Sequence, residues 1–106
     1  MPKFLVQASY SAEGLQGLQK DKASGRLAAA TKAVQSLGGV LESMHFALGA
    51  DDVVIILELP NAGAAAALST AVAATGLVRA RTTALLTVAE MDQALARTAA
   101  FRGPGQ

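Results

Sequence analysis

The segment from Gly49 to Asn61, GADDVVIILELPN, constrains the fold of this 106-residue chain more than any other. Its centre, Val53 to Leu57, is a run of branched apolar residues, which is typical of a strand buried on both faces. The two carboxylates before the run indicate a turn, and the proline and asparagine after it end the strand. The rest of the sequence predicts too few helices to cover both faces of a sheet. We therefore expect a partner to cover the second face.

The composition excludes several classes of function. Basic and acidic side chains nearly balance, with a formal net charge of +1, so we expect no binding to nucleic acid or to a membrane surface through charge. The absence of cysteine excludes disulfides, thiolate metal sites and cysteine nucleophiles. No apolar stretch is long enough for a signal peptide or a membrane span. We expect a soluble cytoplasmic protein with a single domain.

Hydrophobic periodicity and capping residues predict the order of the secondary structure. The expected elements are a strand over 3–10, a helical turn over 11–18, a helix over 24–37, strands over 40–48 and 53–57, a helix over 62–74, a strand over 77–86 and a helix over 88–99. The polar stretch Gln19–Gly25 is expected to be a loop or a kink. Asn61 is the expected N-cap of the helix over 62–74, and Thr87 with Glu90 has the spacing of a capping box.

This order of elements predicts an α+β fold of the ferredoxin-like type, βαββαβ, with an extra C-terminal helix. Right-handed crossovers place both main helices on one side of a four-stranded antiparallel sheet. Apolar area left in water on the other side costs roughly 25 cal/mol per Å². We favour burial of that face between two copies, as a dimeric α/β barrel, over the alternative that the stripe Val88–Leu95 folds across it. Residues 1–99 are expected to form the domain and residues 100–106 a flexible tail.

Four segments carry a resemblance to a known family: KFLVQASYSAEGLQGL near the start, SLGGVLE at 36–42, LGADDVVIILELPN at 48–61 and ATGLVRARTTALLTVAE at 74–90. Over Met1 to Glu90 the chain resembles the GYD domain family, small bacterial and archaeal proteins without an established function. The resemblance implies a ferredoxin-like fold of the dimeric α/β-barrel type. One departure is at Asp51, where the family usually has an aromatic residue.

Six side chains are candidate ligand-binding residues: His45, Arg79, Arg81, Gln7, Ser9 and Tyr10. The two arginines alternate along one face of the fourth strand and repel each other unless an anion or an acidic side chain lies between them. The glutamine and the serine, on the first strand, add neutral hydrogen-bonding groups to the same side. The only histidine is either an acid, base or single ligand, or a half-buried structural residue. The tyrosine either lines a pocket mouth or packs in the core.

The turn before the third strand carries structural candidates. Asp52 is expected to accept backbone amides in the turn that Gly49 begins, whereas Asp51 is expected to be solvated. Adjacent strand residues point to opposite faces, so these carboxylates do not form a catalytic pair. No metal site is predicted, because no second histidine or cysteine accompanies His45.

Three functions fit these observations. The sequence does not indicate a particular cofactor. The first is a homo-oligomeric binding or assembly module whose facing sheets enclose a cavity for a small molecule. The second is an enzyme that resembles the cofactor-independent monooxygenases and haem-degrading proteins of the dimeric barrel class. In it, His45 would act as base or haem ligand, and Arg79 or Arg81 would stabilise an anion. The third is an oligomerisation unit without a ligand.

Overall fold

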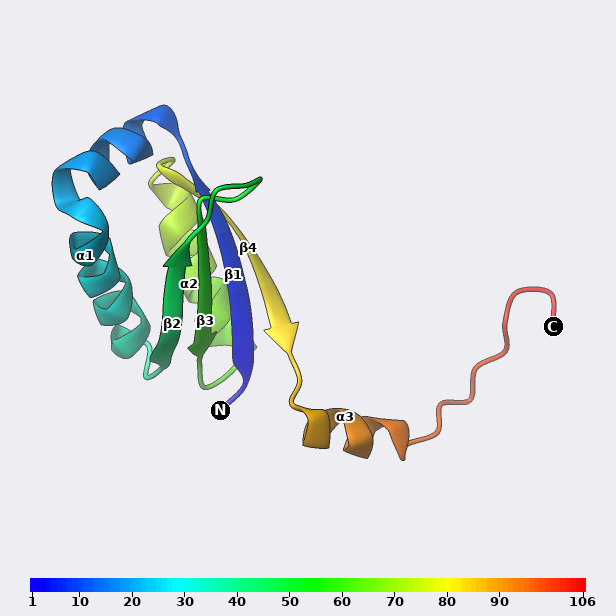
Figure 1. Ribbon diagram of the computed structural model, residues 1–106. Helices are drawn as coiled ribbons and strands as arrows, with labels where there is room; N and C mark the ends of the chain where they lie inside the picture. The colour runs from blue at the N-terminus through cyan, green and yellow to red at the C-terminus, as the bar shows by residue number, and fades with distance from the viewer.

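The computed structural model describes residues 1–106. Four strands form one antiparallel sheet in the order β2-β3-β1-β4; they are β1 (Lys3–Tyr10), β2 (Val40–Phe46), β3 (Val53–Glu58) and β4 (Val78–Leu85). Two helices, α1 (Ala12–Ser36) and α2 (Ala62–Ala74), lie on one face of the sheet, and α3 (Val88–Leu95) follows β4 (Figure 1). The predicted ferredoxin-like α+β arrangement with an extra C-terminal helix is confirmed.

The start of each helix is fixed by the side chain that the sequence places before it. The side-chain oxygen of Ser11 accepts a hydrogen bond from the backbone of Gly14 at 3.1 Å, and that of Asn61 accepts one from the backbone of Ala64 at 2.9 Å. Before α3, Thr87 and Glu90 exchange hydrogen bonds of 2.9 and 3.1 Å in the predicted capping box. The backbone N–H of Thr87 also lowers the pKa of the Glu90 carboxyl below its ordinary value.

Other boundaries differ from the prediction. The helical turn over 11–18 and the helix from 24 are continuous in α1 instead of being separate elements, and the kink expected within Gln19–Gly25 is confirmed at Lys22, where φ is 66°. Strand β2 ends at Phe46, two residues before the predicted end, and its pairing with β3 shifts register between Leu41 and Ser43. Helix α3 ends at Leu95 instead of continuing to residue 99, so the last predicted turn of that helix is wrong.

A small core holds the two main helices to the sheet. Its members are Phe4, Val34, Leu57, Leu59 and Ala65, of which Leu57 and Leu59 are 1% and 0% exposed. In total, 9 of 106 residues are buried. Because the core is this small, a single copy leaves many of its apolar side chains partly in contact with solvent.

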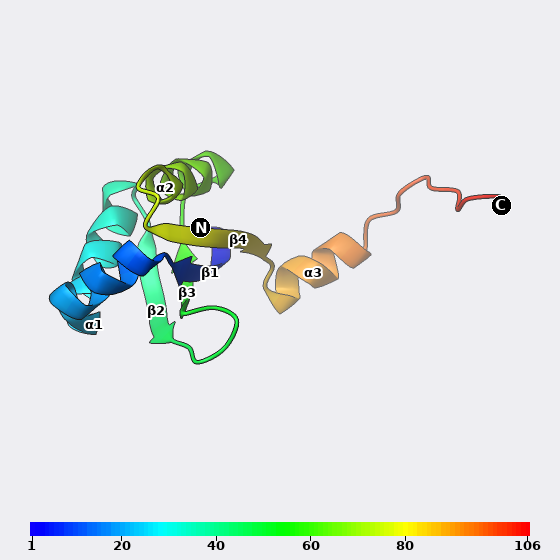
Figure 2. The same cartoon turned by 90° about the horizontal axis from the view of Figure 1, so that it is seen from above.

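Apart from one end, which the β2–β3 loop contacts through Ala50 and Asp51, the sheet face opposite the helices is not covered by any segment of the chain. Residues on this face alternate with core residues, and at its centre Leu5 of β1 pairs with Ile56 of β3, with Val54 two positions away. Seen from above, α3 and the C-terminal segment project away from the sheet (Figure 2). Val88 and Leu95 of α3 are 82% and 69% exposed. The alternative in which the α3 stripe covers this face is therefore not adopted.

The packing of α1 on the start of β4 generates a prediction about Gly14. A Cβ atom at this position would collide with the carbonyl oxygen of Leu77 and press on the Tyr10 ring. We expect Gly14→Ala to lower the free energy of unfolding by about 1–3 kcal/mol, as measured by urea denaturation. Gly17→Ala is the matched control because it has open space around it, and it should raise stability by up to about 1 kcal/mol. Equal stability of the two variants would contradict this description of the contact.

Candidate functional site

The uncovered face carries its polar and apolar side chains in rows across the sheet. Directly paired residues of an antiparallel sheet share a face. One row runs from Ser43 through Ile56 and Leu5 to Thr83, and the next from His45 through Val54 and Gln7 to Arg81. The apolar side chains therefore occupy the two central strands, and most polar candidates lie toward β4 and one end of β1.

Asp51 joins two of the predicted residues into one cluster. One of its carboxylate oxygens accepts a hydrogen bond from Arg81 Nη2 at 2.7 Å and a weaker one from Gln7 Nε2 at 3.5 Å. The side chain of Asp51 is only 17% exposed, whereas that of Arg81 is 65% exposed. The expectation that Asp51 is solvated is therefore wrong, because the β2–β3 loop brings it against β4 and β1. Asp51 is therefore the acidic partner of Arg81, which the sequence alone did not identify.

Arg79 and Ser9 continue the polar surface next to this cluster. They pair directly across β1 and β4. The Ser9 hydroxyl donates to the carbonyl of Ala50 at 3.4 Å, so the loop that carries Asp51 also contacts Ser9. Arg79 is exposed and forms no ion pair in the structure. Its guanidinium is therefore the cation of this face that remains open to an external anion.

Asp52 holds the β2–β3 loop to the end of β1. Its carboxylate accepts a hydrogen bond from the backbone N–H of Tyr10 at 2.8 Å. Its backbone N–H donates to Ala8, and its carbonyl accepts from Ala47, each at 2.8 Å. Gly49 lies at the exposed tip of this loop with open space around it. Through these bonds Asp52 fixes the position from which Asp51 reaches Arg81.

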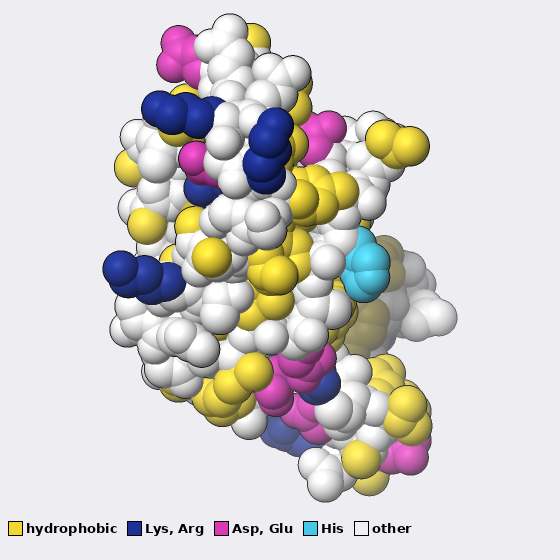
Figure 3. All heavy atoms as spheres, turned by 60° about the vertical axis from the view of Figure 1, so that its left-hand side comes forward, with side chains coloured by type: hydrophobic (Ala, Val, Ile, Leu, Met, Phe, Trp, Pro, Cys, Tyr) yellow, Lys and Arg dark blue, Asp and Glu magenta, His cyan; other side chains and the backbone are white.

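His45 lies apart from the arginines. It is an exposed residue of the edge strand β2, and Figure 3 shows the histidine projecting beside a band of hydrophobic side chains. Three strand spacings separate it from Arg81, which is roughly 14 Å at about 4.8 Å per spacing. It makes no side-chain hydrogen bond that would set its tautomer. A single copy therefore does not bring the histidine and the arginines to one ligand.

Tyr10 is on the other side of the sheet from the remaining candidates. It lines a cavity of about 430 Å³ between the sheet and the helices α1 and α2. Tyr10 is on the helix side because residue 9 and residue 10 point to opposite faces of a strand, and of the two alternatives that the sequence left for it, a pocket mouth or the core, its place in the lining corresponds to the first. The sequence did not single out this cavity or its one basic residue, Arg26.

The far end of the uncovered face carries a separate ion pair. Lys3 donates to a carboxylate oxygen of Glu42, and this hydrogen bond raises the pKa of Lys3 above its ordinary value. No group of three or more histidine, aspartate or glutamate side chains is arranged to hold a metal ion. None of the helices has the length and apolarity needed to cross a membrane.

A family model described as the GYD domain matches residues 4–95, from the second residue of β1 to the last residue of α3. The chain belongs to the GYD domain family. The resemblance seen in the sequence is confirmed, and the match continues five residues beyond the predicted extent. No curated protein and no solved structure matches the chain.

In this GYD domain, Asp51 is a carboxylate paired with Arg81. The pair satisfies the charge of Arg81 within one copy. The alternation of Arg79 and Arg81 indicated that an acidic partner was needed, but the sequence did not show which residue it was.

Proposed function

We propose that this GYD domain protein is a homodimeric, cytoplasmic binding module whose two copies pack their uncovered sheet faces together around a small anionic molecule. The observation that supports the proposal is the apolar centre of that face, formed by Leu5, Val54 and Ile56 on the two central strands. These side chains are only half-buried in a single copy. Apolar area on a sheet face is stabilised by removal from water, at roughly 25 cal/mol per Å².

The distribution of charge around this centre fits a subunit interface. The Lys3–Glu42 pair lies at one end and the Arg81–Asp51 pair lies at the other. Stable interfaces usually have an apolar core and a polar rim of this kind. Because both rim pairs are internally neutral, they do not oppose the approach of a second, identical face.

Arg79 sets the chemistry of the ligand in this proposal. The residue opposite it on β1 is Ser9, and its neighbour Arg81 is already paired with Asp51. In a chamber between two sheets, the unpaired guanidinium of Arg79 needs an anion to offset its desolvation. A carboxylate or phosphate group matches its planar set of donors. The proposed ligand is a small metabolite that carries one such group.

The interface is tested by placing a charge at its centre. We expect wild-type protein to sediment as a dimer at micromolar concentration, and Ile56→Glu to weaken association by about 100-fold or more, because an unpaired buried carboxylate costs several kcal/mol. Leu15→Glu is the control, since Leu15 is an exposed leucine of α1 on the other side of the molecule. A monomeric wild-type protein, or equal dissociation by both variants, would contradict the proposal.

The ligand is tested by a thermal-shift screen of small carboxylates and phosphates against the dimer. We expect at least one compound to raise the melting temperature, and Arg79→Gln to weaken its binding by about tenfold or more through loss of a charge-assisted hydrogen bond. Arg97→Gln removes the same charge beyond the end of α3 and should leave binding unchanged. If no anion stabilises the dimer, the binding function is wrong and only an assembly role remains.

A further inference from the structure

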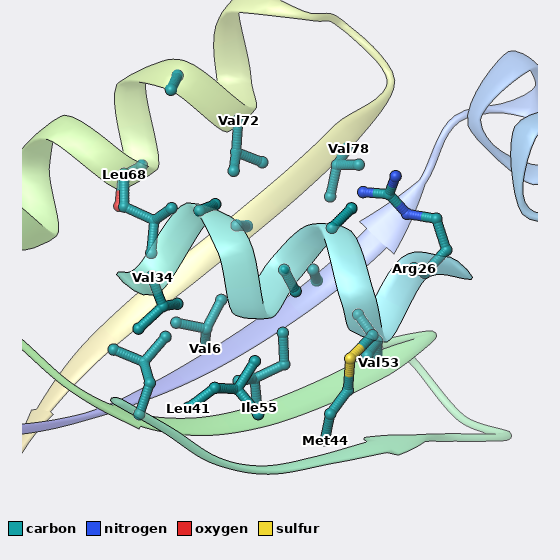
Figure 4. A pocket seen from close by; sticks show the side chains of 18 of the residues that line it. Val6, Arg26, Val34, Leu41, Met44, Val53, Ile55, Leu68, Val72 and Val78 are labelled. Atoms are coloured by element: carbon teal, nitrogen blue, oxygen red, sulfur yellow. The ribbon is translucent and has the colours of Figure 1, made fainter. Parts of the chain in front are cut away.

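The cavity that Tyr10 lines is on the helix side of the sheet, away from the proposed interface. The space of about 430 Å³ lies between the sheet and helices α1 and α2 (Figure 4). All four strands contribute to its floor, and 20 of its 27 lining residues are hydrophobic. Its volume falls within the range of small-molecule sites, roughly 300–1,000 Å³.

The cavity exists because the facing sides of the two helices carry side chains too small to fill the space between them. The alanines that line it are Ala29, Ala30 and Ala33 of α1 and Ala65 and Ala71 of α2. The alanine-rich sequence alone does not predict the cavity, because small side chains permit close packing as readily as they leave space. The space is partly open to solvent, so its apolar lining is left in contact with water. An occupant that removed this apolar surface from water would stabilise the fold.

The two ends of the cavity differ in polarity. At one end, Val34, Leu57 and Leu59 belong to the core and are at most 2% exposed. At the other end the lining includes Asp21 and Arg26. Arg26 and Val34 are eight positions apart on α1, or roughly 12 Å along the helix axis. The cavity thus runs from a closed apolar end to a charged end.

Arg26 is placed to bind an anionic group at the charged end. Its side chain reaches from α1 toward Val78 of β4, across the end of the cavity (Figure 4). Its Nη1 atom lies 3.5 Å from an Asp21 oxygen, and the two side chains are 34% and 47% exposed. An exposed pair of this kind contributes little, and the five N–H groups of a guanidinium leave donors for a second carboxylate.

We propose that this cavity binds one medium-chain carboxylic acid, with its alkyl chain toward Leu57 and Leu59 and its carboxylate on Arg26. Lining and charge together select this class: the walls suit an unbranched apolar chain, and the only basic side chain among the lining residues is Arg26. At roughly 30 Å³ per non-hydrogen atom, the volume that water occupies in the liquid, 430 Å³ holds about 14 atoms. Dodecanoate has this size.

The site is independent of the proposed dimer. It lies on the other side of the sheet from Leu5, Val54 and Ile56, and none of these residues lines it. Ligand binding in the Ile56→Glu variant therefore separates the two proposals. Dodecanoate should bind this variant as it binds the wild-type protein, whether or not the wild-type protein dimerises.

The test is a titration of the full chain with dodecanoate below its micelle concentration, followed by calorimetry and by the fluorescence of Tyr10. This residue is the only tyrosine, the chain has no tryptophan, and Tyr10 lines the cavity, so its emission reports occupancy. We expect one molecule bound per chain. Dodecyltrimethylammonium, with the same chain and opposite charge, should bind at least tenfold more weakly. Equal binding of the two compounds would overturn the assignment of Arg26.

Two variants with matched controls locate the site. Arg26→Gln should weaken dodecanoate binding about tenfold, whereas Lys32→Gln, which removes a charge from the exposed side of the same helix, should not. The double substitution Ala30→Leu and Ala33→Leu adds six carbon atoms, or about 180 Å³ at roughly 30 Å³ per atom, so it should leave too little space for the dodecyl chain, weaken binding by at least tenfold and raise the melting temperature. Ala28→Leu, on the exposed side of α1, should change neither. Unaltered binding in the filled variant would overturn the proposal.

A measurement on the wild-type protein keeps the test decisive if the filled variant does not fold. Nuclear Overhauser effects are expected between the terminal methyl group of bound dodecanoate and the methyl groups of Val34, Leu57 and Leu68. Their absence would overturn the proposal. So would contacts at these methyl groups from Leu95 of a second copy, because they would show that α3 of another chain fills the cavity.

Discussion

Burial of apolar side chains on the central strands is the constraint on which the rest of this structure depends. On the helix side, Phe4 and Leu57 lie in a small core with Val34 of α1. On the other side, Leu5 and Ile56 face solvent in a single copy. A chain with only two helices packed on its sheet can bury one face by itself. The apolar run in β3 is the reason we propose that association of two copies removes the second face from water.

The alanine content of the helices has a second consequence for function. Alanine favours helix formation and costs no side-chain entropy, which helps α1 and α2 form. It also buries little area, so helix packing is incomplete and an apolar cavity remains beside the core. The same composition thus accounts for a regular fold, a small core and an apolar cavity. Each copy thus has two separate proposed sites, one on the uncovered sheet face for a second copy and a small anion, and one on the helix side for a carboxylic acid.

Local signals predicted most of the fold. The starts of α2 and α3 could be predicted from Asn61 and from the Thr87–Glu90 capping box, because capping involves neighbours along the chain. The candidate site was less predictable, since it depends on contacts between distant segments. Asp51 reaches Arg81 only because the β2–β3 loop folds against β4, and the cavity next to Arg26 depends on the spacing of two helices. Neither the approach of Asp51 to Arg81 nor the spacing of α1 and α2 can be read from a single sequence.

The claim that two sheet faces pack together is tested most directly by isotope-filtered nuclear Overhauser spectroscopy on a mixture of labelled and unlabelled protein. We expect intermolecular effects between the methyl groups of Leu5, Val54 and Ile56 in one copy and the same residues in the other. Effects at these methyl groups that arise only within one chain, from Val88 or Leu95 of its own α3, would contradict it. They would show that each copy covers its own sheet.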